Sequence, residues 1–309
     1  LQREVMDALH SYDRASLTPE QQVSYDTYEW YLKDLIQGQE FMYMDYPVNP
    51  IGVLGAQYAI IGLFVDIQPL ASLEDAQAYI SRLKQVKTKF DQVIEGLKLR
   101  EQAGVIAPKL VLQWSLGDIN GIGRSPATST SFYTNFHSKL SAVAGISEAD
   151  KQALLKEAEQ AIQSSVLPAY QALAAEVGRL EKIAPEDFGV WQYPQGEAYY
   201  DYLIRHFTTT SLSAEEIHQL GMDELQRVQG EMRAIFDQLG YPKEEGFDAL
   251  FRRVARDSGS YQGKAILKAY EDAIIFAEQH LEDAFDMRPQ ARLLVKAQPN
   301  PGAAYYSAA

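Results

Sequence analysis

The sequence predicts a mainly α-helical protein, a multi-helix array of long amphipathic helices with a short β element near the C-terminal end. Apolar residues recur at helical spacing along most of the 309 residues, and helix-start signals precede the longest of these runs. The exception is the apolar segment 291–297, which is bounded by Pro289 and Pro299 and has the length of a strand. A strand that follows only helices needs partners, so we expect its open edge to promote self-association of the chain.

Three long helices are predicted in the first half of the chain, over residues 18–38, 72–104 and 147–177. Thr-Pro-Glu-Gln at 18–21 supplies an N-cap, a proline in the first turn and a capping-box partner for the first helix. The second helix carries one continuous apolar face. The third is expected to bend at Pro168, because proline lacks a backbone N–H and its ring crowds the preceding turn. Residues 117–131 collect turn-forming residues without a period, which predicts a loop.

The best internal break in the sequence is the segment 185–196, where proline, glycine and aromatic residues cluster without a period. We therefore expect two helical subdomains, residues 1–184 and 185–309, that together form one continuous structural unit. The second is expected to hold helices over residues 197–207, 213–239, 247–256 and 261–285.

Composition excludes several classes of protein. The net charge of −14 and the pI near 4.8 disfavour nucleic acid and anionic membranes as partners, because both are bound largely through Lys and Arg. The absence of cysteine rules out disulfides, thiolate zinc sites and cysteine nucleophiles. The longest apolar region, 51–65, is shorter than the roughly 20 residues that cross a bilayer, so no transmembrane segment is expected.

The sequence offers neither a catalytic residue nor a complete set of metal ligands. Its five histidines lack the i,i+4 pairing of a zinc helix. Glu215 and His218 have the i,i+3 spacing of di-iron bundles, but such bundles need a second pair of this kind, and capping and helix-dipole roles account for Glu215 and Glu216. The threonine run 208–210 has two readings. It could bind an anion before a helix N-terminus, or it could be an ordinary connector, which is the commoner use.

Short motifs run in a fixed order through nearly the whole chain. They are Leu-Thr-Pro-Glu at 17–20, Ser-Tyr-Asp at 24–26, Leu-Pro-Ala-Tyr at 167–170, Gly-Glu-Ala-Tyr-Tyr at 196–200, Thr-Thr-Thr at 208–210 and Pro-Gly-Ala-Ala-Tyr-Tyr at 301–306. In this order they resemble the N-terminal portion of the bacterial family called domain of unknown function 885. Members of that family look like helical zinc metallopeptidases and are often described as lipoproteins.

The resemblance implies a site that local chemistry alone does not reveal. It implies that 303–306 belongs to a strand leading to a downstream His-Glu-x-x-His helix, whose histidines and a later glutamate hold zinc. The residues that it places at or near the substrate cleft are Tyr305, Tyr306, His206, Thr208, Thr209 and Thr210. This chain contains no His-Glu-x-x-His. We therefore expect it to hold no cofactor and to be inert alone, with zinc in a full-length parent.

The leading hypothesis is that the chain is the N-terminal scaffold and substrate-cleft wall of a zinc-dependent peptidase whose partner is a peptide substrate. The alternative is a non-enzymatic helical binding or scaffold protein. The first residue is Leu1 rather than Met, which a removed leader, proteolysis or a cloning boundary would each explain. We expect the protein to lie outside the cytoplasm, either in the periplasm or anchored to a lipid, rather than in the cytoplasm.

Overall fold

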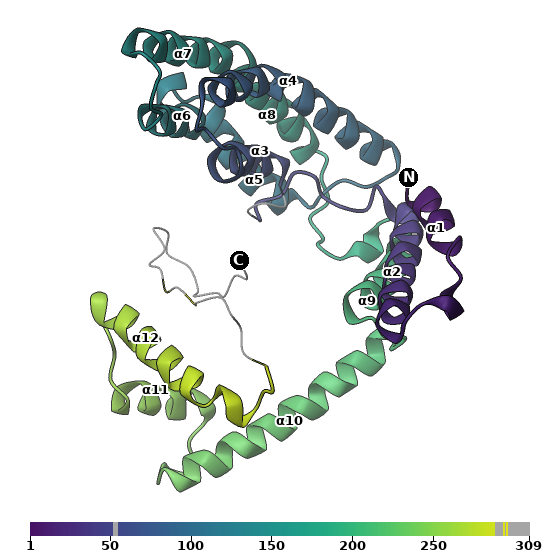
Figure 1. Cartoon of the computed structure of the whole chain (residues 1–309). Helices are drawn as coiled ribbons and strands as arrows, with labels where there is room; N and C mark the ends of the chain where they lie inside the picture. Colours follow the sequence, from purple (N-terminus) through teal and green to yellow (C-terminus); the bar gives the residue numbers. More distant parts are fainter. Residues whose placement is uncertain (52–54, 288–292, 294, 296–309) are drawn as a thin grey trace. The chain divides into compact units, whose positions relative to one another are not determined.

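The computed structural model describes residues 1–51, 55–287, 293 and 295, and its regular structure is helical (Figure 1). The described chain forms two compact units, Leu1–Ile217 and His218–Ala309, so the division falls within the first turn of α10. The boundary predicted after residue 184 lies inside the first unit and stays a prediction. The α-helices are α1 Gln2–His10, α2 Pro19–Gly38, α3 Ala56–Gly62, α4 Leu73–Gln102, α5 Lys109–Gly123, α6 Ser131–Ser141, α7 Glu148–Ala161, α8 Leu167–Glu181, α9 Gly196–Thr208, α10 Ala214–Gln238, α11 Phe247–Asp257 and α12 Lys264–Gln279.

The core of the first unit is an aromatic cluster contributed by α4, α6 and α8. Its rings are at most 1% exposed and belong to Tyr79, Phe90, Phe132, Phe136 and Tyr170. The rings of Phe90 and Tyr170 meet edge to face at 4.8 Å, and those of Tyr79 and Phe136 meet at 4.9 Å. Since each such ring removes about 150–250 Å² from water, the cluster dominates the packing of these helices. The predicted apolar face of α4 is therefore confirmed.

The helix predicted over 147–177 is divided into α7 and α8 by the wide helical turn η6, Ile162–Val166, and the bend expected at Pro168 stays a prediction. A π-helical turn shifts the hydrogen-bonding register by one residue, which accommodates a proline that cannot donate to the turn before it. The buried Ser165 in this turn donates a hydrogen bond to the carbonyl of Lys84 at 3.0 Å and accepts one from the N–H of Lys87 at 3.2 Å. The turn is thus tied to the middle of α4.

A second, smaller core cluster attaches α9 to the end of α2. Phe41 stacks on Tyr202 of α9 at 5.3 Å, and the hydroxyls of Tyr46 and Tyr193 lie 2.8 Å apart. The start of α9 is equally close-packed, because a Cβ on Gly196 would come within 1.9 Å of the carbonyl oxygen of Val190. These contacts fix the position of α9 and of the polar residues in its last two turns.

The predicted short β element is wrong. No strand occurs among the described residues, and Leu293 and Val295, the described positions of segment 291–297, have no regular structure. The other positions of that segment, and the predicted element 303–306, lie outside the described residues. A strand gains its hydrogen bonds from a partner strand, and the described part of the chain supplies none. The self-association expected through that strand loses its basis for the same reason.

The loop predicted over 117–131 is partly wrong, because α5 continues through its glycines to Gly123 before the chain turns. A Cβ on Gly123 would lie only 3.4 Å from Tyr170, so α5 and α8 approach closely at this point. Close packing has overridden the weak helix propensity of glycine.

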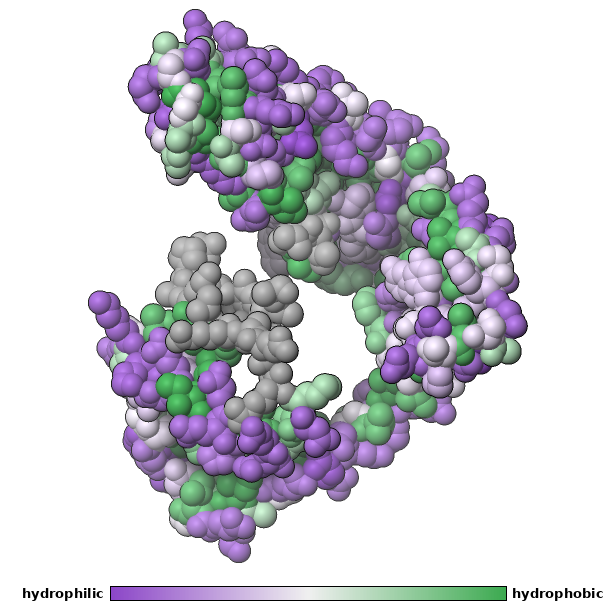
Figure 2. Space-filling view, viewed as in Figure 1, coloured by the Kyte–Doolittle hydropathy of each residue, from purple (hydrophilic) through white to green (hydrophobic). Residues whose placement is uncertain are grey.

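The second unit has a small core and broad apolar surfaces. In its described part, Phe236 of α10 and Leu250 of α11 are buried, and Phe236 contacts the ring of Phe251 edge to face at 6.0 Å. Figure 2 shows apolar surface among the polar residues of α11 and α12. Its large exposed apolar residues on helices include Leu220, Leu225, Ile235, Phe251, Ile266, Tyr270, Ile275 and Phe276. Across the described residues, no helix combines the length and apolar character needed to cross a membrane.

Candidate functional site

A buried carboxylate and a half-exposed imidazole meet where α2 and α9 pack together. Asp34 lies one turn before the end of α2 with its side chain 3% exposed, and His206 lies in the last turn of α9 with its side chain 35% exposed. The His206 Nδ1 atom is 2.6 Å from Asp34 Oδ2. The two residues are 172 positions apart in the sequence, so the packing of the two helices creates this pair.

The placement of His206 follows from the helical repeat of α9. Tyr202 is anchored against Phe41, and His206, four residues later, lies one turn further along the same face of the helix. The imidazole stacks on the Tyr202 ring with centroids 5.6 Å apart. The Tyr202 hydroxyl lies 3.5 Å from Asp34 Oδ2, and burial, together with the nearby carboxylate, raises the pKa of that hydroxyl. The phenol therefore stays protonated and can donate to Asp34.

Arg205 completes the surroundings of the buried carboxylate. Its Nη2 atom is 3.8 Å from Asp34 Oδ1, donates a hydrogen bond to Gln37 Oε1, and belongs to a guanidinium that lies over the Tyr202 ring at 5.7 Å. A distance of 3.8 Å allows Coulomb attraction but is too long for a hydrogen bond. Asp34 Oδ1 accordingly has no hydrogen-bond partner among the described residues. Burying a charge is costly unless it is paired, so His206 and Arg205 are what allow a carboxylate at this depth.

The pair with Asp34 fixes which nitrogen of His206 is available to a ligand. A carboxylate only accepts hydrogen bonds, so the Nδ1 atom facing Asp34 carries a proton. In the neutral imidazole the lone pair is then on Nε2, for which the described residues offer no partner. The site therefore presents one hydrogen-bond acceptor, or one potential metal ligand, on a rigid helix end.

The threonine run continues from the same helix end. Thr208 Oγ1 donates to the carbonyl of Ile204 at 2.7 Å and accepts from the N–H of Thr210 at 3.2 Å. Thr209 has a φ of 56° and ends α9 by donating its N–H to the carbonyl of Arg205. These bonds are those of a compact connector between α9 and α10. The structure thus brings His206 and residues 208–210 together, while Tyr305 and Tyr306 lie outside the described residues.

The capping role expected for Glu216 is confirmed. Its Oε2 accepts from the N–H and from the hydroxyl of Ser213, each at 2.8 Å, and Ser213 Oγ accepts from the N–H of Glu216 at 3.3 Å. The backbone N–H of Ser213 and then its hydroxyl lower the pKa of Glu216. Glu216 is therefore engaged in starting α10 and is not available as a ligand.

Asp34 is the residue that sequence reasoning missed. A carboxylate among the apolar positions of α2 is the only local sign of it, and acidic residues are common on solvated helix faces. Its burial depends on Tyr202 and His206, which lie far away in the sequence.

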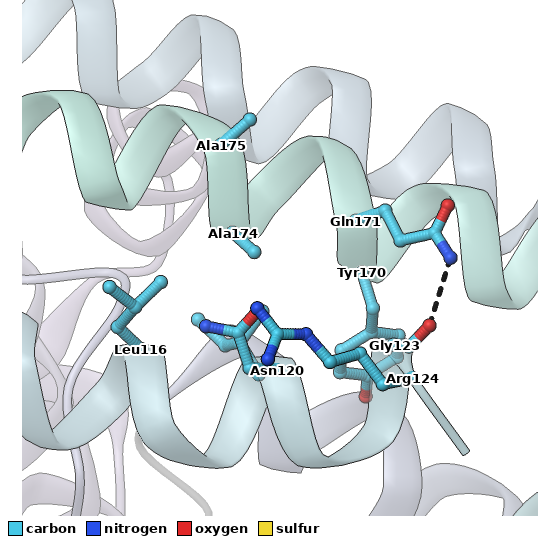
Figure 3. Close-up of a pocket in the computed structure, with 9 residues that line it drawn as sticks. Leu116, Asn120, Gly123, Arg124, Tyr170, Gln171, Ala174 and Ala175 are labelled. Atoms are coloured by element: carbon cyan, nitrogen blue, oxygen red, sulfur yellow. Dashed lines mark hydrogen bonds between the residues drawn. The ribbon is translucent and has the colours of Figure 1, made fainter.

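A shallow groove between α5 and α8 is the second feature of interest in the first unit (Figure 3). It has a volume of about 480 Å³, with Leu116 and Ala174 on its walls. Gln171 donates a hydrogen bond to the carbonyl of Gly123 at 2.9 Å. In the view of Figure 3 the side chain of Arg124 extends away from this bond toward Asn120. The groove is lined by neither a carboxylate nor a histidine. The Asp34–His206 site, which has both of these groups, is therefore the stronger candidate.

Comparison with known proteins places this helical fold in a family. The family model described as "Bacterial protein of unknown function (DUF885)" matches residues 1–309, so the chain belongs to the DUF885 family. The chain is also similar to a solved structure, that of the "putative lipoprotein from Colwellia psychrerythraea". The TM-score is 0.73 at 24% sequence identity, and the match covers 81% of this chain and 43% of that one, which shows a shared fold. The chain thus spans under half the length of that protein. No curated protein matches it.

Proposed function

We propose that this chain is the N-terminal helical scaffold and substrate-cleft wall of a zinc-dependent peptidase. The observation that carries the proposal is the Asp34–His206 pair, in which a buried carboxylate holds a half-exposed imidazole with a free Nε2. A histidine fixed in this way can contact a substrate without undergoing chemistry itself. His206 and the connector 208–210 then border the cleft, and Tyr305 and Tyr306 belong to the same wall.

The zinc in this proposal is held by residues other than those described. A catalytic zinc needs three protein ligands, and the described residues contain no group of three His, Asp or Glu side chains that could hold a metal ion. The residues present therefore do not fit a complete zinc site, and His206 could supply one ligand at most. In this proposal the chain is expected to be inert alone, and its contribution is to bind and orient a peptide.

The longer relative supports the scaffold role and the proposed location. The fold of this chain occurs in the Colwellia protein as part of a chain more than twice as long as the matched region. Because that protein is described as a "putative lipoprotein", we place this one outside the cytoplasm, periplasmic or lipid-anchored. Fractionation of the source cells, followed by detection of the protein with an antibody, tests this location.

The second candidate is a non-enzymatic helical binding or scaffold protein. The exposed apolar residues of α10 and α12 favour it, because apolar patches on a protein surface commonly mark interaction sites. In this case the chain would bind a partner and no metal would be involved.

Zinc content and peptide hydrolysis of the whole gene product separate the two candidates. The comparison pairs that product with the 309-residue chain, each purified, loaded with zinc and assayed on a mixture of blocked peptides. Hydrolysis and one bound zinc in the whole product, with neither in the chain, is the expected result. A whole product that contains no zinc-binding helix and cleaves no peptide would refute the peptidase proposal and favour the binding protein.

A further inference from the structure

Building on the proposed function, we infer that His206 and Arg205 form a subsite for the backbone of a peptide, with Asp34 as the positioning residue. Both side chains reach the same buried carboxylate, so the His206 imidazole and the Arg205 guanidinium lie side by side at the end of α9. His206 offers an acceptor at Nε2. Arg205 offers donors at Nε and Nη1, since its described hydrogen bond uses Nη2.

The pairing of one acceptor with adjacent donors matches a peptide unit. Each peptide unit carries one N–H and one C=O, so an N–H of the ligand can donate to His206 Nε2 while a C=O accepts from Arg205. Single-function groups match less well, because a carboxylate has no donor for Nε2 and an ammonium has no acceptor for the guanidinium.

Charge also favours a neutral ligand at this position. The buried carboxylate of Asp34 contacts the imidazole and lies near the guanidinium, whose charge it balances. The cluster is therefore neutral while His206 is neutral. An anion placed against Arg205 and His206 would face Asp34 and receive little net attraction. The peptide backbone is the polar, uncharged ligand that this arrangement suits.

The subsite is rigid before any ligand arrives. The Tyr202 ring packs against both the His206 imidazole and the Arg205 guanidinium, at 5.6 and 5.7 Å. Side chains that are already ordered lose little rotamer entropy on binding. An apolar surface is also next to the pair, because Phe207 is 77% exposed and contacts the His206 ring edge to face at 4.8 Å. The peptide residue bound here is therefore expected to carry an apolar side chain.

Nitrogen-15 NMR of the histidine-labelled chain tests the inference directly. The His206 signals are assigned by their loss in His206→Gln. The expected result is an imidazole protonated at Nδ1 with a bare Nε2, whose signal shifts saturably when acetyl-Ala-Phe-Ala-amide is added. Acetyl-Ala-Gly-Ala-amide is expected to bind more weakly. An Nε2-protonated tautomer, or a His206 signal unmoved by saturating amounts of either peptide, would overturn the inference.

Asp34→Asn tests the positioning role, and Asp26→Asn, an exposed aspartate of the same helix that pairs with Arg14, is the matched control. Loss of one charge-assisted hydrogen bond should weaken peptide binding by about 3- to 10-fold and raise the share of the Nε2-protonated tautomer. The control should leave both unchanged. If Asp34→Asn does not fold, the tautomer and titration of the unaltered chain still decide the matter.

The outcome is separable from that of the proposed function. Peptide binding at His206 in a whole gene product that hydrolyses no peptide would leave the subsite standing and remove the peptidase. Peptide hydrolysis by a product whose His206 signal does not change on adding peptide would support the peptidase and remove the subsite.

Discussion

Replacing His206 by alanine should destabilise the first unit more than replacing Asp34, although Asp34 is the buried member of the pair. His206→Ala leaves a carboxylate that is 3% exposed with only Arg205, at 3.8 Å, to balance its charge. Asp34→Ala leaves the Arg205 guanidinium and the His206 imidazole without their carboxylate, but each of these side chains is more than one-third exposed and can turn toward water. The two variants differ in stability because His206→Ala leaves its remaining partner away from solvent, whereas Asp34→Ala does not.

The structure gives an approximate size for each effect. Removing one partner of a fully buried charge pair costs about 3–5 kcal/mol. Because His206 is 35% exposed and Arg205 can move closer to Asp34, we expect about 2–3 kcal/mol for His206→Ala. For Asp34→Ala we expect about 1 kcal/mol, the usual contribution of a hydrogen bond. The protein with both substitutions should be less destabilised than the one with His206→Ala alone, because it no longer contains the unpaired carboxylate of Asp34.

Urea unfolding followed by tryptophan fluorescence measures these differences. The three tryptophans, Trp30, Trp114 and Trp191, all lie in the first unit, so the signal reports on the unit that contains the pair. A difference of about 1 kcal/mol moves the urea midpoint by about 0.3–1 M. If Asp34→Ala proves as destabilising as His206→Ala, or the double substitution proves the worst of the three, Asp34 is not a desolvated charge that depends on its partners.

Three further predictions follow from the core and the helix junctions. Burial raises the pKa of Tyr79 to about 12, above the ordinary 10 of the unfolded chain. Its contribution, on the order of 3 kcal/mol, is therefore complete below pH 10 and lost as the pH rises toward 12. Urea midpoints at pH 8 and pH 11.5 should show this loss, and Tyr79→Phe should reduce it. Ser165→Ala should cost about 1 kcal/mol in thermal or urea unfolding, because it removes the two hydrogen bonds that join η6 to Lys84 and Lys87 of α4. The exposed Ser164→Ala in the same turn should be nearly neutral. Gly196→Ala should destabilise the protein by about 1–3 kcal/mol and loosen α9, because the added Cβ would clash with the Val190 carbonyl. Gly221→Ala is the control, since its Cβ would meet no atom within 4 Å. Equal stability of the two variants would contradict the packing described at the start of α9.

The proposed subsite and the proposed peptidase place different demands on the chain. The subsite needs the Asp34–His206–Arg205 arrangement, which lies entirely within the first unit. The peptidase also needs a metal site that the described residues do not form. Binding experiments on this chain can therefore be interpreted by themselves, while the peptidase proposal is tested by the hydrolysis assay on the whole gene product.

Local interactions made much of the fold predictable from sequence. The capping box at the start of α2 forms as expected, with Gln21 Oε1 accepting from the N–H of Thr18 at 2.9 Å and Thr18 Oγ1 accepting from the N–H of Gln21 at 3.3 Å. The apolar face of α4 is buried where its period placed it. Both signals act within one or two helical turns, so the residues that produce them are close together in the sequence.

Features that depend on distant partners were decided by the tertiary structure. The predicted β element failed because a strand is stabilised by a neighbouring strand, and the described chain has none. The glycine-rich end of α5 is helical because it packs closely on Tyr170 of α8. Asp34 and His206 became a pair only when Phe41 and Tyr202 brought α9 against α2. The sequence by itself determined the helices, whose hydrogen bonds are local. The candidate site was decided by tertiary packing, because burying a charge is tolerable only where the folded chain supplies its partners.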